Sequence, residues 1–116
     1  MAGTITVEGA VNGLLSGSVK FGPATITGSS TAAGQVVACP LIAGANTITV
    51  PAGTTAVAIF PPSSSAVTLQ LKGTTGDTGF YLSPKSPTVL PFDQNNMPGT
   101  IVLVAGAAMM VDIGYI

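Results

Sequence analysis

The chain has 116 residues, of which only 6% are charged, against about 25% in ordinary soluble domains. Its net charge is −1, from three lysines and four acidic residues, with no arginine and no histidine. These counts exclude a histidine-dependent catalytic triad, a zinc site built on imidazole and an arginine clamp for anions. Three scattered lysines cannot neutralise a phosphate track. We therefore expect no enzyme activity, no metal or other cofactor and no nucleic-acid partner.

The length fits one domain, residues 1–116. An apolar content of 47%, rich in Val, Ile and Thr, predicts a folded chain. So small a net charge gives little repulsion between copies, which predicts a homo-oligomer whose neutral surface is covered by partners. The first residues, MAGTITVEGA, show no secretory pattern, and the longest apolar run, IVLVAGAAMMV, is too short for a membrane helix. The expectation is synthesis in a cytoplasm without membrane insertion.

Alternation of apolar and polar residues is the dominant pattern along the chain, in TITVE, NTITVP, AVTLQLK and MMVDIGYI. A period of two predicts half-buried antiparallel strands. TAVAIFP and TIVLVA are apolar on both faces, which predicts central strands or strands covered by a neighbour. The predicted strands, in chain order, are Thr4–Glu8, Gly17–Phe21, Ala24–Thr27, Val36–Cys39, Asn46–Val50, Thr55–Phe60, Ala66–Lys72, Gly79–Leu82, Thr88–Phe92, Thr100–Val104 and Met109–Tyr115.

Short strands separated by Gly- and Pro-rich turns predict an all-β fold, an antiparallel β-sandwich of the jelly-roll kind. The pattern is clearest from Asn46 to Ile116. Residues 1–45 are richer in Gly, Ser and Ala, and two interpretations are open for them. They form an irregular arm or flap laid over a neighbouring subunit, or they pair within the same sandwich.

Three features invite a chemical interpretation. The glycine-rich GTTGDTG segment lacks the lysine and the helix of a phosphate loop, and one carboxylate is too few for calcium, so a turn in which Asp77 accepts from backbone N–H groups is favoured. Glu8 and Asp112 could meet if the two terminal strands pair. Cys39, between Ala38 and Pro40, is predicted to be a buried, inert thiol.

The segment GFYLSPKSPTVLPFD supplies the candidate interface residues Phe80, Tyr81, Lys85 and Phe92. Adjacent residues of a strand point to opposite faces, so one ring of the Phe80–Tyr81 pair should lie on the outer face. Its prolines keep the segment at a sheet edge or in an extended loop, where an outward aromatic suits a subunit contact. Burial of both rings under neighbouring loops is equally compatible with the sequence.

From Asn46 to Ile116, the order NTITVPAGTTAVAIFPP, then AVTLQLKGTTGDTGFYLSPKSPTVLPFD, then a short apolar strand pair resembles small all-β structural proteins of tailed-phage virions. The resemblance implies a decoration or tail-associated protein, made in the host cytoplasm and carried in the virion. A trimer or larger ring docked on the major capsid or tail protein is then expected. The alternative is a host-recognition, carbohydrate-binding module of a tail or fibre, which needs exposed aromatic side chains.

Overall fold

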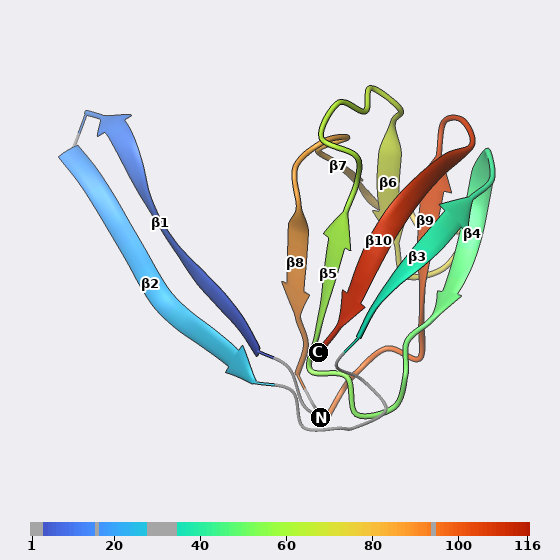
Figure 1. Ribbon diagram of the computed structural model, residues 1–116, viewed down its shortest axis with the longest axis horizontal. Helices are drawn as coiled ribbons and strands as arrows, with labels where there is room; N and C mark the ends of the chain where they lie inside the picture. Colours follow the sequence, from blue (N-terminus) through green and yellow to red (C-terminus); the bar gives the residue numbers. More distant parts are fainter. Residues whose placement is uncertain (1–3, 16, 28–34, 94) are drawn as a thin grey trace.

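The computed structural model describes residues 4–15, 17–27, 35–93 and 95–116. These residues contain ten β-strands and no helix, and the strands form three antiparallel sheets (Figure 1). The first sheet is the hairpin of β1 (Thr4–Leu14) and β2 (Gly17–Thr27). The second sheet has the order β3 (Gln35–Leu41), β10 (Met109–Tyr115), β5 (Ala56–Phe60) and β8 (Thr88–Pro91). The third has the order β4 (Gly44–Thr49), β9 (Thr100–Ala105), β6 (Leu69–Lys72) and β7 (Phe80–Leu82).

The two four-stranded sheets enclose the core, as the alternating pattern predicts. Along β4, Ile48 is buried while its neighbours Thr47 and Thr49 are exposed. The largest fully buried side chains come from both sheets, and they are Val57, Ile59, Leu69, Leu103, Val111 and Ile113. Burial of such side chains supplies the main favourable term in folding, at about 25 cal/mol per Å² of apolar area. The prediction of an all-β antiparallel sandwich is confirmed.

The four-stranded sheets contain a nested set of strand pairs. β3 pairs with β10, β4 with β9, β5 with β8, and β6 with β7. In every pair, the two partner residues lie equally far along the chain from a point between Gly73 and Gly76. Leu41 opposite Met109 and Leu69 opposite Leu82 are examples. Residues 35–116 are therefore one long antiparallel hairpin, wrapped so that its two arms contribute to both sheets.

The strands that are apolar on both faces occupy the interior of their sheets. β5 lies between β10 and β8, and β9 lies between β4 and β6. This confirms the prediction made from TAVAIFP and TIVLVA. The connection between β3 and β4, which crosses from one sheet to the other, is fixed by Asn46. Its side-chain amide donates to the carbonyl oxygens of Ile42 (3.0 Å) and Gly44 (2.9 Å) within the turn, and to that of Leu103 (3.1 Å) on β9.

Two sequence predictions for the first 27 residues are wrong in detail. The segments Gly17–Phe21 and Ala24–Thr27 are one strand, β2, because an irregularity at Gly22 and Pro23 interrupts the alternation without ending the pairing. The strand predicted at Thr4–Glu8 continues to Leu14. Gly22 and Pro23 thus form a bulge within a paired strand and not a turn between two strands.

The segment 1–45 is divided between two parts of the molecule. Residues 35–41 and 44–49 form β3 and β4 of the sandwich, whereas residues 4–27 form the separate hairpin. The hairpin stands to one side of the sandwich and diverges from it away from the chain ends (Figure 1). It lengthens the molecule, so the Cα radius of gyration is 15.1 Å, above the roughly 13 Å expected of a compact chain of this size.

Candidate functional site

The two sheets of the sandwich present different outer faces. In the β4-β9-β6-β7 sheet, the outward positions carry the polar residues Thr47, Thr49, Gln70, Lys72 and Thr100, with Ala45, Val102 and Val104 among them. Hydroxyl, amide and ammonium groups at these positions can be hydrated directly. This is the ordinary pattern for an antiparallel sheet with one face in water.

The outer face of the β3-β10-β5-β8 sheet is almost entirely apolar. The register places its outward residues opposite those of the core, and we call the following set the apolar sheet face: Val36, Ala38, Pro40, Ala56, Ala58, Phe60, Val89, Pro91, Met110 and Gly114. Val36 is 64% exposed and Met110 is 50% exposed. Asp112 is the one charged residue among the outward positions of these four strands. Its exposed members are Val36, Ala38, Pro40, Phe60, Pro91 and Met110, whereas Ala56, Ala58 and Gly114 between them are buried. Exposed apolar side chains gathered on one face mark a contact surface.

Phe60 and Gly114 shape the centre of the apolar sheet face. A Cβ atom on Gly114 would lie 3.7 Å from the Cε2 atom of the Phe60 ring and 3.7 Å from the Cβ of Ala58. The ring therefore lies against a flat strip of small residues. Beside it is a hollow of about 340 Å³ lined by Phe60, Met110, Asp112 and the two prolines that follow β5.

The β1–β2 hairpin also has one apolar and one polar side. Register and alternation place a set of apolar residues together, which we call the apolar hairpin face: Ile5, Val7, Val11, Val19, Ala24 and Ile26. Val11 is 45% exposed and Val19 is 52% exposed, and the others are exposed or half-buried. The opposite side carries Thr4, Thr6, Glu8, Ala10, Lys20 and Thr25.

The bulge at Gly22 keeps the apolar residues of β2 on one side. One residue lies between Val7 and Gly9 on β1, but two lie between their Cα partners Ala24 and Phe21 on β2. The extra residue moves Val19 onto the side occupied by Ile26, where strict alternation would have put Lys20. Gly22 has φ of +78°, and a Cβ there would collide with the carbonyl oxygen of Val7. Glycine is thus required at this bulge.

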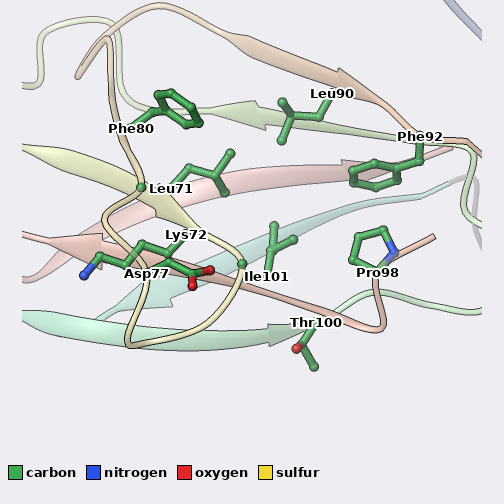
Figure 2. Close-up of a pocket in the computed structure, with 11 residues that line it drawn as sticks. Leu71, Lys72, Asp77, Phe80, Leu90, Phe92, Pro98, Thr100 and Ile101 are labelled. Atoms are coloured by element: carbon green, nitrogen blue, oxygen red, sulfur yellow. The ribbon is translucent and has the colours of Figure 1, made fainter. Parts of the chain in front are cut away.

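A third surface lies at the open edge of the sandwich, where β7 and β8 face each other. Leu71, Phe80, Leu90, Phe92 and Ile101 point into a groove of about 400 Å³, with Lys72 and Asp77 at one end (Figure 2). Phe80 is 77% exposed and Tyr81 is 75% exposed, so the alternative that both rings are buried is wrong.

The adjacent rings still point to opposite faces, as the strand alternation predicts. Phe80 pairs with Leu71 and lies on the core side, while Tyr81 pairs with Gln70 on the outer side. Phe80 is exposed because the sandwich is open at this edge. Phe92 is half-buried in the groove and Lys85 is exposed beyond β7. The groove thus joins Phe80 to Phe92, and neither Tyr81 nor Lys85 lines it.

No family model, curated protein or solved structure matches this chain.

Asp77 forms the turn expected of it. Its carboxylate accepts the Thr74 N–H at 2.8 Å, and its own N–H donates to the Thr74 carbonyl at 3.1 Å. The hydrogen bond from the Thr74 backbone lowers the pKa of the carboxyl below its usual 3.8. This turn joins β6 to β7 and closes the long hairpin.

The remaining candidates for chemistry lie apart. Glu8 is on β1, which pairs only with β2, and Asp112 is on β10, which pairs with β3 and β5, so the pairing that would bring the two carboxylates together does not form. Cys39 is half-buried against the core, and burial raises the pKa of its thiol. Within the described ranges, no group of three or more potential metal ligands is present. No helix in the described part of the chain is long and apolar enough to cross a membrane.

Only part of this arrangement could be predicted from the sequence. TAVAIFP is apolar on both faces of its strand, and this indicated an apolar outer face, because Ala56, Ala58 and Phe60 of β5 point outward. The alternation in MMVDIGYI also places Met110 on the side of Asp112, opposite Val111 and Ile113. That Val36 and Met110 share one face with Phe60 becomes apparent only when β3 and β10 are placed next to β5.

Proposed function

We propose that this protein is a structural virion subunit that decorates or cements a phage capsid through oligomeric β-sandwich contacts. The observation that carries the proposal is the apolar sheet face, on which Val36, Phe60 and Met110 are exposed in the isolated chain and Asp112 is the one charged residue. In this proposal other subunits cover that face, and the Thr-rich face of the opposite sheet remains in water.

The energetics favour such a contact. Each 100 Å² of apolar area removed from water contributes about 2.5 kcal/mol, and few charges have to be desolvated to offset this gain. Phe60 and Met110 supply the large side chains, and the hollow beside Phe60 offers a place for a partner side chain. Aromatic and methionine side chains are enriched at the centres of interfaces.

The strand order supports the jelly-roll part of the proposal. Eight strands, nested as one long hairpin and divided between two four-stranded sheets, fit a double-sheet jelly roll, an architecture that capsid domains use. The resemblance between residues 46–116 and small phage structural proteins is the reason for assigning the assembly to a tailed phage. The subunit would be made in the host cytoplasm and would assemble as a trimer or larger ring on the major capsid or tail protein.

A second candidate is a host-recognition module of a tail or fibre that binds carbohydrate. It is favoured by the exposure of Phe80 and Tyr81 beside the groove, because sugar rings pack on exposed aromatic faces. A glycan array distinguishes the two functions. Glycan binding that is lost in Tyr81→Ala would favour the recognition function. No glycan binding by the unsubstituted protein, together with unchanged adsorption of phage that carry Tyr81→Ala, would exclude it.

Immunoelectron microscopy tests the virion proposal. Antibody fragments raised against the purified protein are added to purified phage particles whose genome encodes this chain, and their positions are imaged. Regular labelling of the capsid shell is the expected result. Labelling of the tail would favour the second candidate, a tail or fibre module. Particles that carry no label, from which mass spectrometry also detects no peptide of the chain, would overturn the proposal.

A further inference from the structure

The β1–β2 hairpin lacks a partner for its apolar side in the described chain. Its apolar face holds Val11 and Val19, both about half exposed, and none of the residues of the buried core comes from β1 or β2. A two-stranded hairpin is marginally stable at best in water unless it packs against another element. The hairpin therefore requires a surface that the described residues of one chain do not provide.

We propose that the apolar hairpin face packs on the apolar sheet face of a second copy of the chain. The inference rests on the proposed function, in that both require assembly, and it adds which segment meets which surface. Each copy would donate one hairpin and receive one. This holds for a two-fold pair, in which the exchange is reciprocal, and for a closed ring, in which it runs from each copy to the next.

The two surfaces match in size. Six steps of about 3.3 Å from Ile5 to Val11 give the apolar hairpin face a length of about 20 Å. The four strands of the receiving sheet span about 14 Å between the axes of β3 and β8, and side chains extend beyond both. A hairpin laid across these strands at Phe60 would cover its ring and the neighbouring Met110.

The contact area is largest when two copies exchange hairpins with each other. Two strands of 11 residues, about 4.8 Å apart, present a face of roughly 350 Å². One docked hairpin thus falls short of the roughly 800 Å² per partner that a stable interface buries. In a reciprocal two-fold pair, donating one hairpin and receiving another doubles the area to roughly 700 Å² per partner, which approaches that requirement. In a ring, the two contacts are made with different neighbours, and each keeps the smaller area.

The charges favour this side of the hairpin as the contact. Glu8 and Lys20 lie on the opposite side, so both remain hydrated when the apolar hairpin face is covered. Asp112 is the one charged residue on the outward positions of the receiving strands. Docking the polar side instead would bury the Glu8 and Lys20 charges, which is costly without partners.

Crosslinking between two differently tagged chains tests the contact. Both chains carry Cys39→Ala; one also carries Val7→Cys and the other Met110→Cys. After mixing and treatment with a short bis-maleimide, gel mobility identifies the heterodimer and peptide mass spectrometry locates the link. A link between positions 7 and 110 of different chains is expected, and it should be lost when Thr6→Cys, on the polar side, replaces Val7→Cys.

A second measurement uses the full chain without crosslinking. Val7→Asp should lose the oligomer in sedimentation velocity, whereas Thr6→Asp adds the same charge to the polar side and should retain it. Equal behaviour of the two variants, or equal crosslinking from positions 6 and 7, would overturn the proposal. A link that forms only within one chain carrying both Val7→Cys and Met110→Cys would show that the hairpin folds onto its own sheet, which also overturns it.

The two proposals fail separately. If antibody fragments label the particles but positions 7 and 110 of different chains do not crosslink, the hairpin contact is wrong and the virion function stands. If the crosslink forms but no particle is labelled, the contact stands and the virion function is wrong.

Discussion

The ring of Phe60 lies against Gly114 on the outer face of the β3-β10-β5-β8 sheet, where a Cβ on the glycine would be 3.7 Å from the ring. Asp112 lies on the same outer side, with Phe60 as its Cα partner on β5. An aromatic ring, a strip of small residues and a single carboxylate thus form the centre of a face that is otherwise apolar. The solvent exposure of Val36, Phe60 and Met110 on this face is the physical basis of both proposals.

Replacing Met110 with lysine should weaken self-association. The lysine would place an ammonium group on a face that the assembly removes from water, and burying an unpaired charge is costly. We expect the dissociation constant of the oligomer to rise by at least about tenfold, equivalent to about 1.4 kcal/mol. Sedimentation velocity measures it. Gln70→Lys, which adds the same charge to the Thr-rich face of the other sheet, is the matched control and should leave association unchanged.

Gly22→Ala should disrupt the hairpin without affecting the sandwich. A Cβ at position 22 meets the Val7 carbonyl oxygen and lies 2.7 Å from the Cα of Glu8. Positive φ alone costs a non-glycine residue about 1–2 kcal/mol. Hydrogen exchange of the β1 and β2 amides should accelerate, while the thermal midpoint of the sandwich stays constant. Gly13→Ala separates the two effects, because Gly13 also has positive φ (+76°) but would meet nothing within 4 Å; its effect should be smaller.

Ile59→Ala should destabilise the sandwich. The side chain is fully buried on β5 between the two sheets, and removing it leaves a cavity, with an expected loss of about 2–5 kcal/mol in the free energy of unfolding. Urea unfolding followed by circular dichroism measures this loss. Thr47→Ala on the exposed side of β4 should change the free energy by less than about 0.5 kcal/mol. Similar losses for the two variants would contradict the assigned core.

Asp77 should contribute to acid sensitivity. Its carboxyl pKa is lower in the folded chain than its usual 3.8 because the Thr74 backbone N–H donates to the carboxylate. A lowered folded pKa stabilises the fold above the unfolded pKa, and this stabilisation is lost as the pH falls through the folded value. Asp77→Asn should therefore lower stability at neutral pH and flatten its decline below about pH 4.

Denaturant unfolding at a series of pH values measures this effect. Thr75→Ala lies in the same loop and keeps the carboxylate, so it should retain the full decline. An Asp77→Asn variant whose stability falls with acid as steeply as that of the unsubstituted chain would contradict the role given to this turn.

The candidate surfaces could be predicted only in part. Adjacent Phe80 and Tyr81 must point to opposite faces of β7, which the sequence shows, but the exposure of Phe80 depends on the open edge between β7 and β8. The bulge in β2 was missed because Gly22–Pro23 resembles a turn, whereas the pairing of Ala24 with Val7 and of Phe21 with Gly9 continues through it.

The sequence alone determined the antiparallel β-sandwich class, because alternation of apolar and polar residues and the positions of Gly and Pro act locally. Alternation divides each strand into two sides but leaves open what covers them. Only the tertiary structure decided that Met110 lies beside Phe60 and that the first two strands stand apart as a hairpin. The reason is that the surroundings of a side chain depend on which distant strands become its neighbours.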